Sequence, residues 1–292
     1  MSSDSDTTVN YYKYYHYHPS LAGACVFAAL FGVSTIWHLI QITKHRTWYF
    51  IPLLVGGIFE VVGYGARGAS SAQMLNLTLA PYVIQTLLLL VAPALLAATI
   101  YMILGRIIMS VDGESLSLVK KRWLTKIFVT SDVLSFFIQL GGGGLMASSD
   151  ASSAKLGSHL ILGGLLLQII IFGFFIAVSL VFHLRLRAMP TSQSHNPSLP
   201  WKKFLYVVYS TCALIMIRSI VRVAEFIGGF DGRILKHEVY LYVFDAVPMA
   251  AVMVIFNIWY PSNFSKQARK AIVDGESVDS SVEFSNVELQ SK

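Results

Sequence analysis

The feature that most constrains this chain is a series of seven apolar runs, each long enough to cross a bilayer. The hydrocarbon core is about 30 Å thick, and a helix needs roughly 20 residues to span it. Open strands would leave backbone groups unpaired in lipid, and the runs lack the alternation typical of a barrel. We therefore predict an all-α membrane protein with seven transmembrane helices. The predicted spans are residues 20–42, 48–67, 79–105, 127–148, 158–182, 204–227 and 239–260.

The composition supports a membrane protein. Charged residues make up 13% of the chain, whereas a soluble globular protein carries roughly 25%. The net charge is +6, but the basic residues cluster between the apolar runs, so we predict no nucleic-acid partner. The two cysteines, Cys25 and Cys212, both lie in apolar runs. This excludes a disulfide framework and a four-cysteine zinc site.

The distribution of basic residues between alternate loops predicts the orientation of the chain. One set of loops holds 15 Lys and Arg residues and the other holds 5. Because cytosolic loops are enriched in these residues, we expect the N-terminus outside and the C-terminus in the cytosol. The first run is too long for a signal-peptide core, so the first helix is expected to remain as an anchor.

The predicted organisation has three parts. Residues 1–19 form an aromatic extracellular segment, 20–260 form the transmembrane domain, and 261–292 form a disordered, polar cytosolic tail.

Several polar side chains interrupt the apolar runs. A charge near the middle of a membrane helix costs about 2.5 to 3.5 kcal/mol on insertion scales, so such residues usually face the bundle interior. Helical spacing places Arg218, Arg222 and Glu225 on one face of the sixth span. Two further side chains, Glu60 and Asp245, lie in the second and seventh spans.

We predict that these groups line a water-accessible cavity that binds a polar head group. Residues that come from the spans themselves are Glu60, Tyr64, Arg67, Gln85, Gln139, His159, Gln168, Arg218, Arg222, Glu225 and Asp245, with Asp132 placed toward the cytosolic side. Three arginines match three carboxylates in number, so a neutral, mutually paired cluster is expected. The alternative is that the same groups only hold the helices together.

Other kinds of chemistry find little support. No helix carries an HExxH or HxxxH pair, so no zinc hydrolase site is predicted. The run Gly141 to Gly144 lacks the Lys-Ser/Thr of a P-loop, and we expect it to bend the helix or to allow close backbone approach. The chain shows no ATP-hydrolysing domain, so transport is expected to be downhill, exchange-driven or coupled to an ion gradient. We predict no cofactor.

The polar residues, taken in order, resemble a known pattern. The chain is similar to the fungal lipid-translocating exporter family, the RTA-like seven-helix membrane proteins, over all seven spans. The resemblance lies in Glu60-x-x-Gly63-Tyr64-x-x-Arg67, Ala92-Pro93-Ala94 with Tyr101 and Gly105-Arg106, Asp132-x-x-Ser135 with Gln139 and Gly141-Gly142-Gly143, Gly164 with Gln168, Arg218-x-x-x-Arg222-x-x-Glu225, and Glu238 with Tyr242 and Asp245. One departure is Tyr260-Pro261, where the family commonly has a His-Pro pair.

The resemblance implies a transporter or flippase-like exporter of amphipathic lipids such as sphingoid long-chain bases, and it adds Tyr242 to the predicted substrate-binding residues. Its expected partners are a lipid-like amphiphile and the membrane itself. We expect the plasma membrane as its location, with an internal membrane as the alternative. Three other functions stay open: a seven-helix receptor or sensor for a lipid-like ligand, a porphyrin transporter, and an intramembrane lipid hydrolase.

Overall fold

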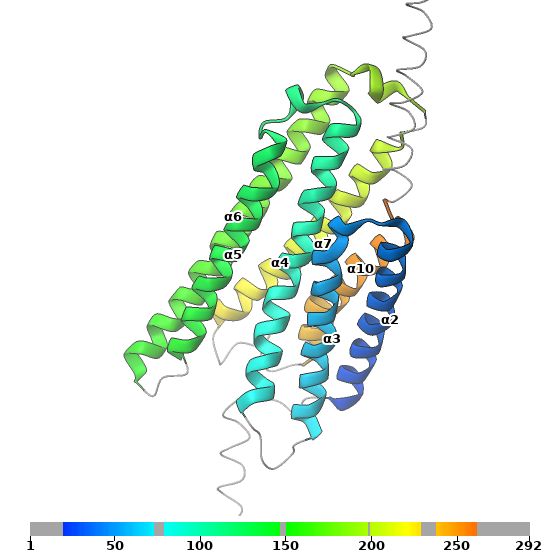
Figure 1. Ribbon diagram of the computed structural model, residues 1–292. Helices are drawn as coiled ribbons and strands as arrows, with labels where there is room; N and C mark the ends of the chain where they lie inside the picture. The colour runs from blue at the N-terminus through cyan, green and yellow to red at the C-terminus, as the bar shows by residue number, and fades with distance from the viewer. Residues whose placement is uncertain (1–19, 73–78, 147–149, 198, 229–237, 262–292) are drawn as a thin grey trace, which may run out of the picture.

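A computed structural model describes residues 20–72, 79–146, 150–197, 199–228 and 238–261. The predicted extracellular segment and nearly all of the predicted cytosolic tail lie outside these residues. The described part is all-α (Figure 1). Seven helical stretches in it are long and apolar enough to cross a membrane, which confirms the predicted fold class.

The elements follow one another as alternating passes along the bundle (Figure 1). The long helices are α2 (Leu21–His45), α3 (Ile51–Ala72), α4 (Leu79–Ser110), α5 (Lys121–Met146), α6 (Ala151–Ala188) and α7 (Trp201–Gly228). The seventh pass has three pieces, namely α9 (Glu238–Leu241), a π-helical turn (Tyr242–Ala246) and α10 (Val247–Ile258). Short 3₁₀ turns occur at Trp48–Phe50, Glu114–Leu116 and Ser192–His195.

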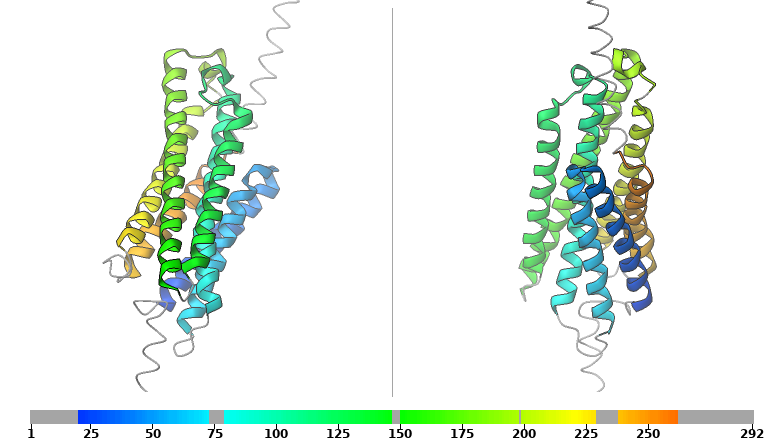
Figure 2. Two further views of the ribbon diagram at one scale, coloured as in Figure 1. Left: turned by 90° about the vertical axis from the view of Figure 1, so that its left-hand side faces the viewer. Right: turned by 45° about the vertical axis from the view of Figure 1, so that its right-hand side comes forward.

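The helices form two groups that share α4 and α7. In Figures 1 and 2, α5 and α6 run together along one side, and α2, α3 and α10 gather on the other. Contacts link α4 to both groups, while α7 packs against α4, α6 and α10. The described chain begins at one end of the bundle and finishes its last helix running toward the other, as an odd number of passes requires. The predicted orientation relative to the two sides of a membrane stays a prediction.

Residue type explains which helix faces turn inward. The core is built from apolar side chains such as Phe31, Phe128, Phe175 and Phe256, all nearly inaccessible. Large apolar side chains also point outward, among them Val33 and Ile170. An exposed apolar surface on so many helices suits lipid as the surrounding solvent.

Several helix boundaries differ from the predicted ones. The helix α3, which corresponds to the second predicted span, continues past Arg67 to Ala72. The helix predicted to begin at 158 begins at Ala151, because Asp150 caps it by accepting a hydrogen bond from the Ser153 amide. Polar and small residues at these ends lowered the hydropathy without stopping the helix.

The glycine run does not fray the fourth span. The helix α5 continues through Gly141 to Gly144 as far as Met146. A side chain built at Gly142 would place its Cβ 2.7 Å from the Gly157 carbonyl oxygen of α6, whereas the same atom at Gly143 would meet nothing within 4 Å. The predicted close backbone approach is therefore confirmed at Gly142.

Candidate functional site

The candidate site is organised around a backbone carbonyl that a proline leaves free. Pro93 lies inside α4 and has no amide hydrogen, so it cannot donate to the Leu89 carbonyl four residues earlier. Arg218 of α7 donates to that oxygen through Nη2 at 2.6 Å. An unpaired carbonyl in a membrane interior is costly, and the arginine removes the cost. Arg218 is thereby fixed between α4 and the seventh pass.

Asp245 accepts the charges of two arginines. It forms ion pairs with Arg218 through Nε and with Arg222 through Nη2, the latter at 2.5 Å. Arg222 also pairs with Glu225 one turn further along α7, at 3.1 Å. We call these four residues the arginine–aspartate network. The predicted helical spacing in the sixth span is confirmed, since it brings Arg218, Arg222 and Glu225 into one set of contacts.

A π-helical turn presents Asp245 to the arginines. The Val247 amide bonds to the Tyr242 carbonyl, five residues back, and Pro248 follows directly. A proline cannot donate to the carbonyl four residues before it and clashes with it in a regular helix, so the wider turn relieves both problems. Asp245 lies inside this turn with 5% exposure.

Glu60 and Tyr64 lie beside this network on α3. Electrostatic interactions connect both side chains to Asp245, Arg218 and Arg222. Glu60 is 2% exposed, and its Oε1 has no hydrogen-bond partner among the described residues. The Tyr64 hydroxyl likewise has none there. These two buried polar atoms face a neighbourhood that already holds several charges.

The predicted neutral pairing of three arginines with three carboxylates is wrong in its partners. Arg67 pairs instead with Glu238, at 2.7 Å, and Glu60 takes part in no ion pair within the described residues. Glu60 and the arginine–aspartate network together thus hold two guanidinium groups and three carboxylates, one of which is Glu60 itself. Counting charges along the sequence could not reveal this, because it says nothing about which helix a side chain meets.

Arg67 belongs to a second group of contacts, which we call the Arg67 cluster. Its Nε donates to the Tyr242 hydroxyl at 3.2 Å, and Glu238 also accepts a hydrogen bond from the Ser20 amide at 2.9 Å. The cluster ties the start of α2 to α3 and α9. Glu238 was missed as a site residue, although it stands four residues before Tyr242 and seven before Asp245, the same spacing that revealed the sixth span.

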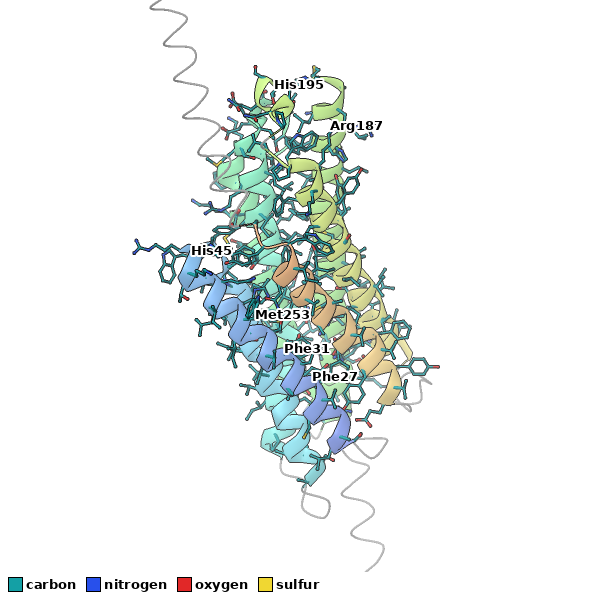
Figure 3. All side chains as sticks on the ribbon, turned by 90° about the vertical axis from the view of Figure 1, so that its right-hand side faces the viewer. Phe27, Phe31, His45, Arg187, His195 and Met253 are labelled. Atoms are coloured by element: carbon teal, nitrogen blue, oxygen red, sulfur yellow. The ribbon has the colours of Figure 1, made fainter. Side chains whose placement is uncertain are left out.

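Aromatic rings connect the two groups of charges. The Tyr64 ring stacks on Phe31 at 5.6 Å, and Phe27 stacks on Tyr242 at 5.2 Å. Tyr64 and Tyr242 lie 6.3 Å apart between them. Figure 3 shows Phe27 and Phe31 following each other along α2, beside α10. The polar side chains are therefore bordered on the α2 side by aromatic rings.

The remaining predicted site residues from the third, fourth and fifth spans take part in none of the ion pairs of the network. Gln139 donates to Gln168 at 3.4 Å, which joins α5 to α6. Gln85 is buried on α4, with the backbone beside it facing Gly63 of α3. His159 is exposed on α6, so the structure does not bring it to the network. The sequence could not show whether this histidine faces the bundle or the outside, because α6 carries apolar residues on all of its faces.

The predicted water-accessible chamber is closed in this conformation. The side chains of Arg218 and Asp245 are 5% and 7% exposed, while Arg222 and Glu225 are 17% and 18% exposed. The charges do converge, as expected, but they bind one another, and within the network the more exposed side chains are Arg222 and Glu225. Mutual pairing is the physical reason, since unpaired charges in a low-dielectric interior are costly.

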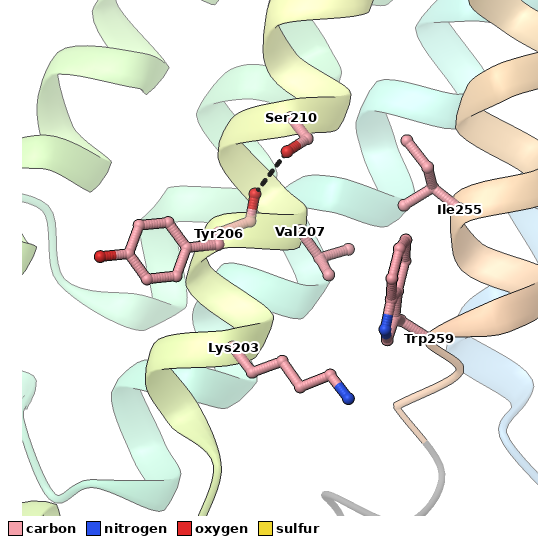
Figure 4. A pocket seen from close by; sticks show the side chains of 6 residues that line it. All are labelled: Lys203, Tyr206, Val207, Ser210, Ile255 and Trp259. Carbon is pink, nitrogen blue, oxygen red and sulfur yellow. Dashed lines mark hydrogen bonds between the residues drawn. The ribbon is translucent and has the colours of Figure 1, made fainter.

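A surface groove lies between α7, which carries the arginines of the network, and α10, which directly follows the turn that holds Asp245. Its residues come from the beginning of α7 and the end of α10. It encloses about 460 Å³ and is lined by Lys203, Tyr206, Val207, Ser210, Ile255 and Trp259. In Figure 4, Val207, Ile255 and Trp259 form an apolar wall above the Lys203 amine. Eight residues of α7 separate Ser210 from Arg218, or about 12 Å of helix.

Sequence comparisons assign the chain to a family. Residues 53–268 match the family model described as RTA1 like protein. The chain belongs to the RTA1-like family. This confirms the predicted resemblance to the lipid-translocating exporters. The RTA1-like match begins within α3 and so takes in both Glu60 and the arginine–aspartate network.

Relatives of this RTA1-like chain are named for different functions. It is 40% identical to "Protoporphyrin uptake protein 1" of Saccharomyces cerevisiae, over 86% of this chain and 93% of the relative. It is 28% identical to "Probable lipid transporter atnI" of Emericella nidulans, over 87% and 71%. It is 26% identical to "Sphingoid long-chain base transporter RSB1" of Saccharomyces cerevisiae, over 83% and 72%. The search of solved structures gave no significant match.

Proposed function

We propose that this protein is a membrane transporter for amphipathic lipids, and that the cargo's head group binds beside Glu60 and the arginine–aspartate network. The observation that carries this proposal is the surplus carboxylate. Glu60 is buried and its Oε1 has no partner among the described residues, while both nearby arginines are directed at Asp245. A positively charged head group supplies the missing counter-ion, so a cationic amphiphile fits this site best.

The protein also offers an apolar surface that can contact the hydrocarbon part of such a cargo. The groove on α7 and α10 offers Val207, Ile255 and Trp259 to a hydrocarbon chain, and Lys203 stands at its edge. The polar network and the apolar groove share α7, and the turn that holds Asp245 leads directly into α10. A molecule that combines a charged head with a long chain requires both kinds of surface. The relative named as a sphingoid long-chain base transporter supports a cationic amphiphile as the cargo, because sphingoid bases carry an amine and a long chain.

A second candidate cargo is a porphyrin. The relative named as a protoporphyrin uptake protein is 40% identical to this chain, whereas the relative named as a sphingoid long-chain base transporter is 26% identical. A protoporphyrin carries two carboxylates and a flat apolar ring. The carboxylates would compete with Asp245 for Arg218 and Arg222, and the ring would pack against Tyr64 and Phe31. The two candidates therefore depend on opposite charges in the same site.

The test is transport by the purified full chain in liposomes. The probes are a fluorescent sphingoid base, a fluorescent zwitterionic phospholipid and protoporphyrin. We expect Glu60→Gln to slow sphingoid-base transport roughly tenfold or more, since a charge-assisted hydrogen bond contributes about 1.5 to 3 kcal/mol. Arg222→Gln should affect protoporphyrin more than the base. Glu114→Gln is the matched control, because Glu114 is an exposed carboxylate in a short connecting turn.

Three outcomes decide against the proposal or one of its parts. Probe movement no faster than in empty liposomes, with folded protein, removes the transporter function. A ligand-dependent signal from the protein without flux of that ligand favours the receptor alternative. If Glu60→Gln and Glu114→Gln transport the base equally well, the surplus carboxylate is not the head-group site.

A further inference from the structure

A second buried carboxylate lies away from the network, between α4 and α5. Asp132 of α5 is 4% exposed, and it accepts a hydrogen bond from the Tyr101 hydroxyl at 2.9 Å through Oδ2. Ser135 stands three residues further along α5 and is fully buried. Tyr101 is held by Phe128 and Phe175, with ring centroids at 5.3 and 4.5 Å. The group is therefore enclosed by rings and packed apolar residues.

Two atoms of this group have no partner among the described residues. They are Asp132 Oδ1 and Ser135 Oγ. Residues three apart lie on the same face of a helix, so both atoms belong to one side of α5. None of the ion pairs between described residues includes Asp132. A carboxylate this deep in the bundle, without a counter-ion, requires a ligand that supplies positive charge.

The neighbouring side chains indicate which ligand this is. The titratable group that faces Asp132 from α4 is Tyr101, and Cys212 of α7 interacts in turn with Tyr101. From α6, Phe172 and Phe175 pack against the Tyr101 ring. Among the described residues, no group of three His, Cys, Asp or Glu could hold a metal ion.

A hard cation such as Mg²⁺ takes about six oxygen ligands, and the backbone carbonyls of the continuous helix α5 are engaged within the helix. A proton needs only one oxygen. A proton on Oδ1 neutralises the buried carboxylate without any further ligand. One proton therefore resolves the charge at Asp132.

We propose that Asp132 is a proton-binding site whose loading and release couple proton movement to transport of the cargo. This proposal rests on the proposed transport function. Tyr101 lies on α4, the helix that also holds Leu89, whose carbonyl oxygen Arg218 binds. The two residues are twelve positions apart, or about 18 Å along the helix. Pro93 lies between them and removes one helical hydrogen bond from α4. Movement of α4 about this point links Asp132 to the arginine–aspartate network.

The first experiment detects the proton without any transport. Infrared difference spectra of the purified chain between acid and alkaline pH should contain the carbonyl band of a buried protonated carboxyl group. We expect Asp132→Asn to lose the contribution of Asp132 to this band, and Glu114→Gln to keep it, while the buried carboxyl group of Glu60 is the same in all three proteins. Should Asp132→Asn fail to fold, Tyr101→Phe retains the carboxyl but removes its donor, so the band should shift. A wild-type spectrum whose buried-carboxyl band is absent, or unchanged in both Asp132→Asn and Tyr101→Phe, overturns the proposal.

The second experiment measures coupling in liposomes with an imposed pH difference. The probe is a fluorescent quaternary-ammonium amphiphile, because its own charge does not titrate. For one proton per cargo molecule, one pH unit should change the wild-type accumulation ratio by about tenfold, and the Asp132→Asn ratio should not respond. An equal response in both proteins overturns the coupling. Absence of transport in both proteins defeats the proposed function instead, and the infrared result then decides whether Asp132 binds a proton.

Discussion

Replacing Asp245 with asparagine tests the arginine–aspartate network most directly. The aspartate is the shared counter-ion of Arg218 and Arg222. After Asp245→Asn, Arg222 keeps Glu225, but Arg218 keeps only the neutral Leu89 carbonyl. The Arg218 guanidinium group, 5% exposed in the folded protein, then has no ion-pair partner in this arrangement, although the Glu60 carboxylate lies nearby.

The magnitude follows from that single unpaired charge. An arginine at the centre of a membrane helix costs about 2.5 to 3.5 kcal/mol on insertion scales, and breaking a buried ion pair in a soluble protein costs about 3 to 5 kcal/mol. We therefore expect Asp245→Asn to lower the free energy of unfolding by about 3 kcal/mol. Glu225→Gln is the matched control. Its carboxylate is 18% exposed, and we expect a loss of at most about 1 kcal/mol.

The assay is unfolding in mixed detergent micelles with increasing sodium dodecyl sulfate, followed by circular dichroism. The double variant Arg218→Gln with Asp245→Asn removes the unpaired charge, so it should be more stable than Asp245→Asn alone. An Asp245→Asn loss below about 1 kcal/mol would refute the reasoning, because the free energy of one buried charge lies well above that value. A double variant that loses the sum of the two single losses would refute it as well.

Three further predictions concern packing, a buried hydroxyl and a helix cap. Gly142→Ala should cost about 1 to 3 kcal/mol in unfolding free energy through overpacking against α6, whereas Gly143→Ala should be neutral or slightly stabilising, since its Cβ meets nothing within 4 Å. Tyr260→Phe should cost about 1 kcal/mol in the same assay, because the Tyr260 hydroxyl is hydrogen-bonded to the buried Thr47. Hydrogen bonds from the Ser152 and Ser153 hydroxyls and the Ser153 amide hold the pKa of Asp150 at about 2, below its ordinary 3.8. Stabilisation by this cap is thus complete above pH 4 and lost as the pH falls toward 2; amide exchange in the first turn of α6 should show this in the wild type and not in Asp150→Asn.

The seven helices could be predicted because lipid leaves the backbone few alternatives. A run of about 20 apolar residues has to form its hydrogen bonds internally, and helices do so whatever lies beside them. The helix ends could not be predicted as well, because they depend on local contacts. The helix α6 begins at Ala151 through the Asp150 cap, seven residues before the predicted start at 158.

The sequence could predict which site residues share one face of a helix, but not which residues of different helices form ion pairs. Helical spacing grouped Arg218, Arg222 and Glu225 correctly, since that grouping depends only on the geometry of α7. Contacts between helices depend on the packing of the whole bundle. For that reason the partner of Arg67, which is Glu238, could not be inferred from the number of charges.

Two prolines explain why the charges meet where they do. Pro93 frees the carbonyl that Arg218 binds, and Pro248 accompanies the π-helical turn that presents Asp245 to the same arginine. Both α4 and the seventh pass thus depart from regular helical hydrogen bonding at the same group of side chains. A helix changes its geometry most readily where its backbone bonds are already replaced by others. The network therefore stands where α4, α7 and the seventh pass meet through bonds other than regular helical ones, and the proposed transport function requires the charged head group to enter and leave at this point.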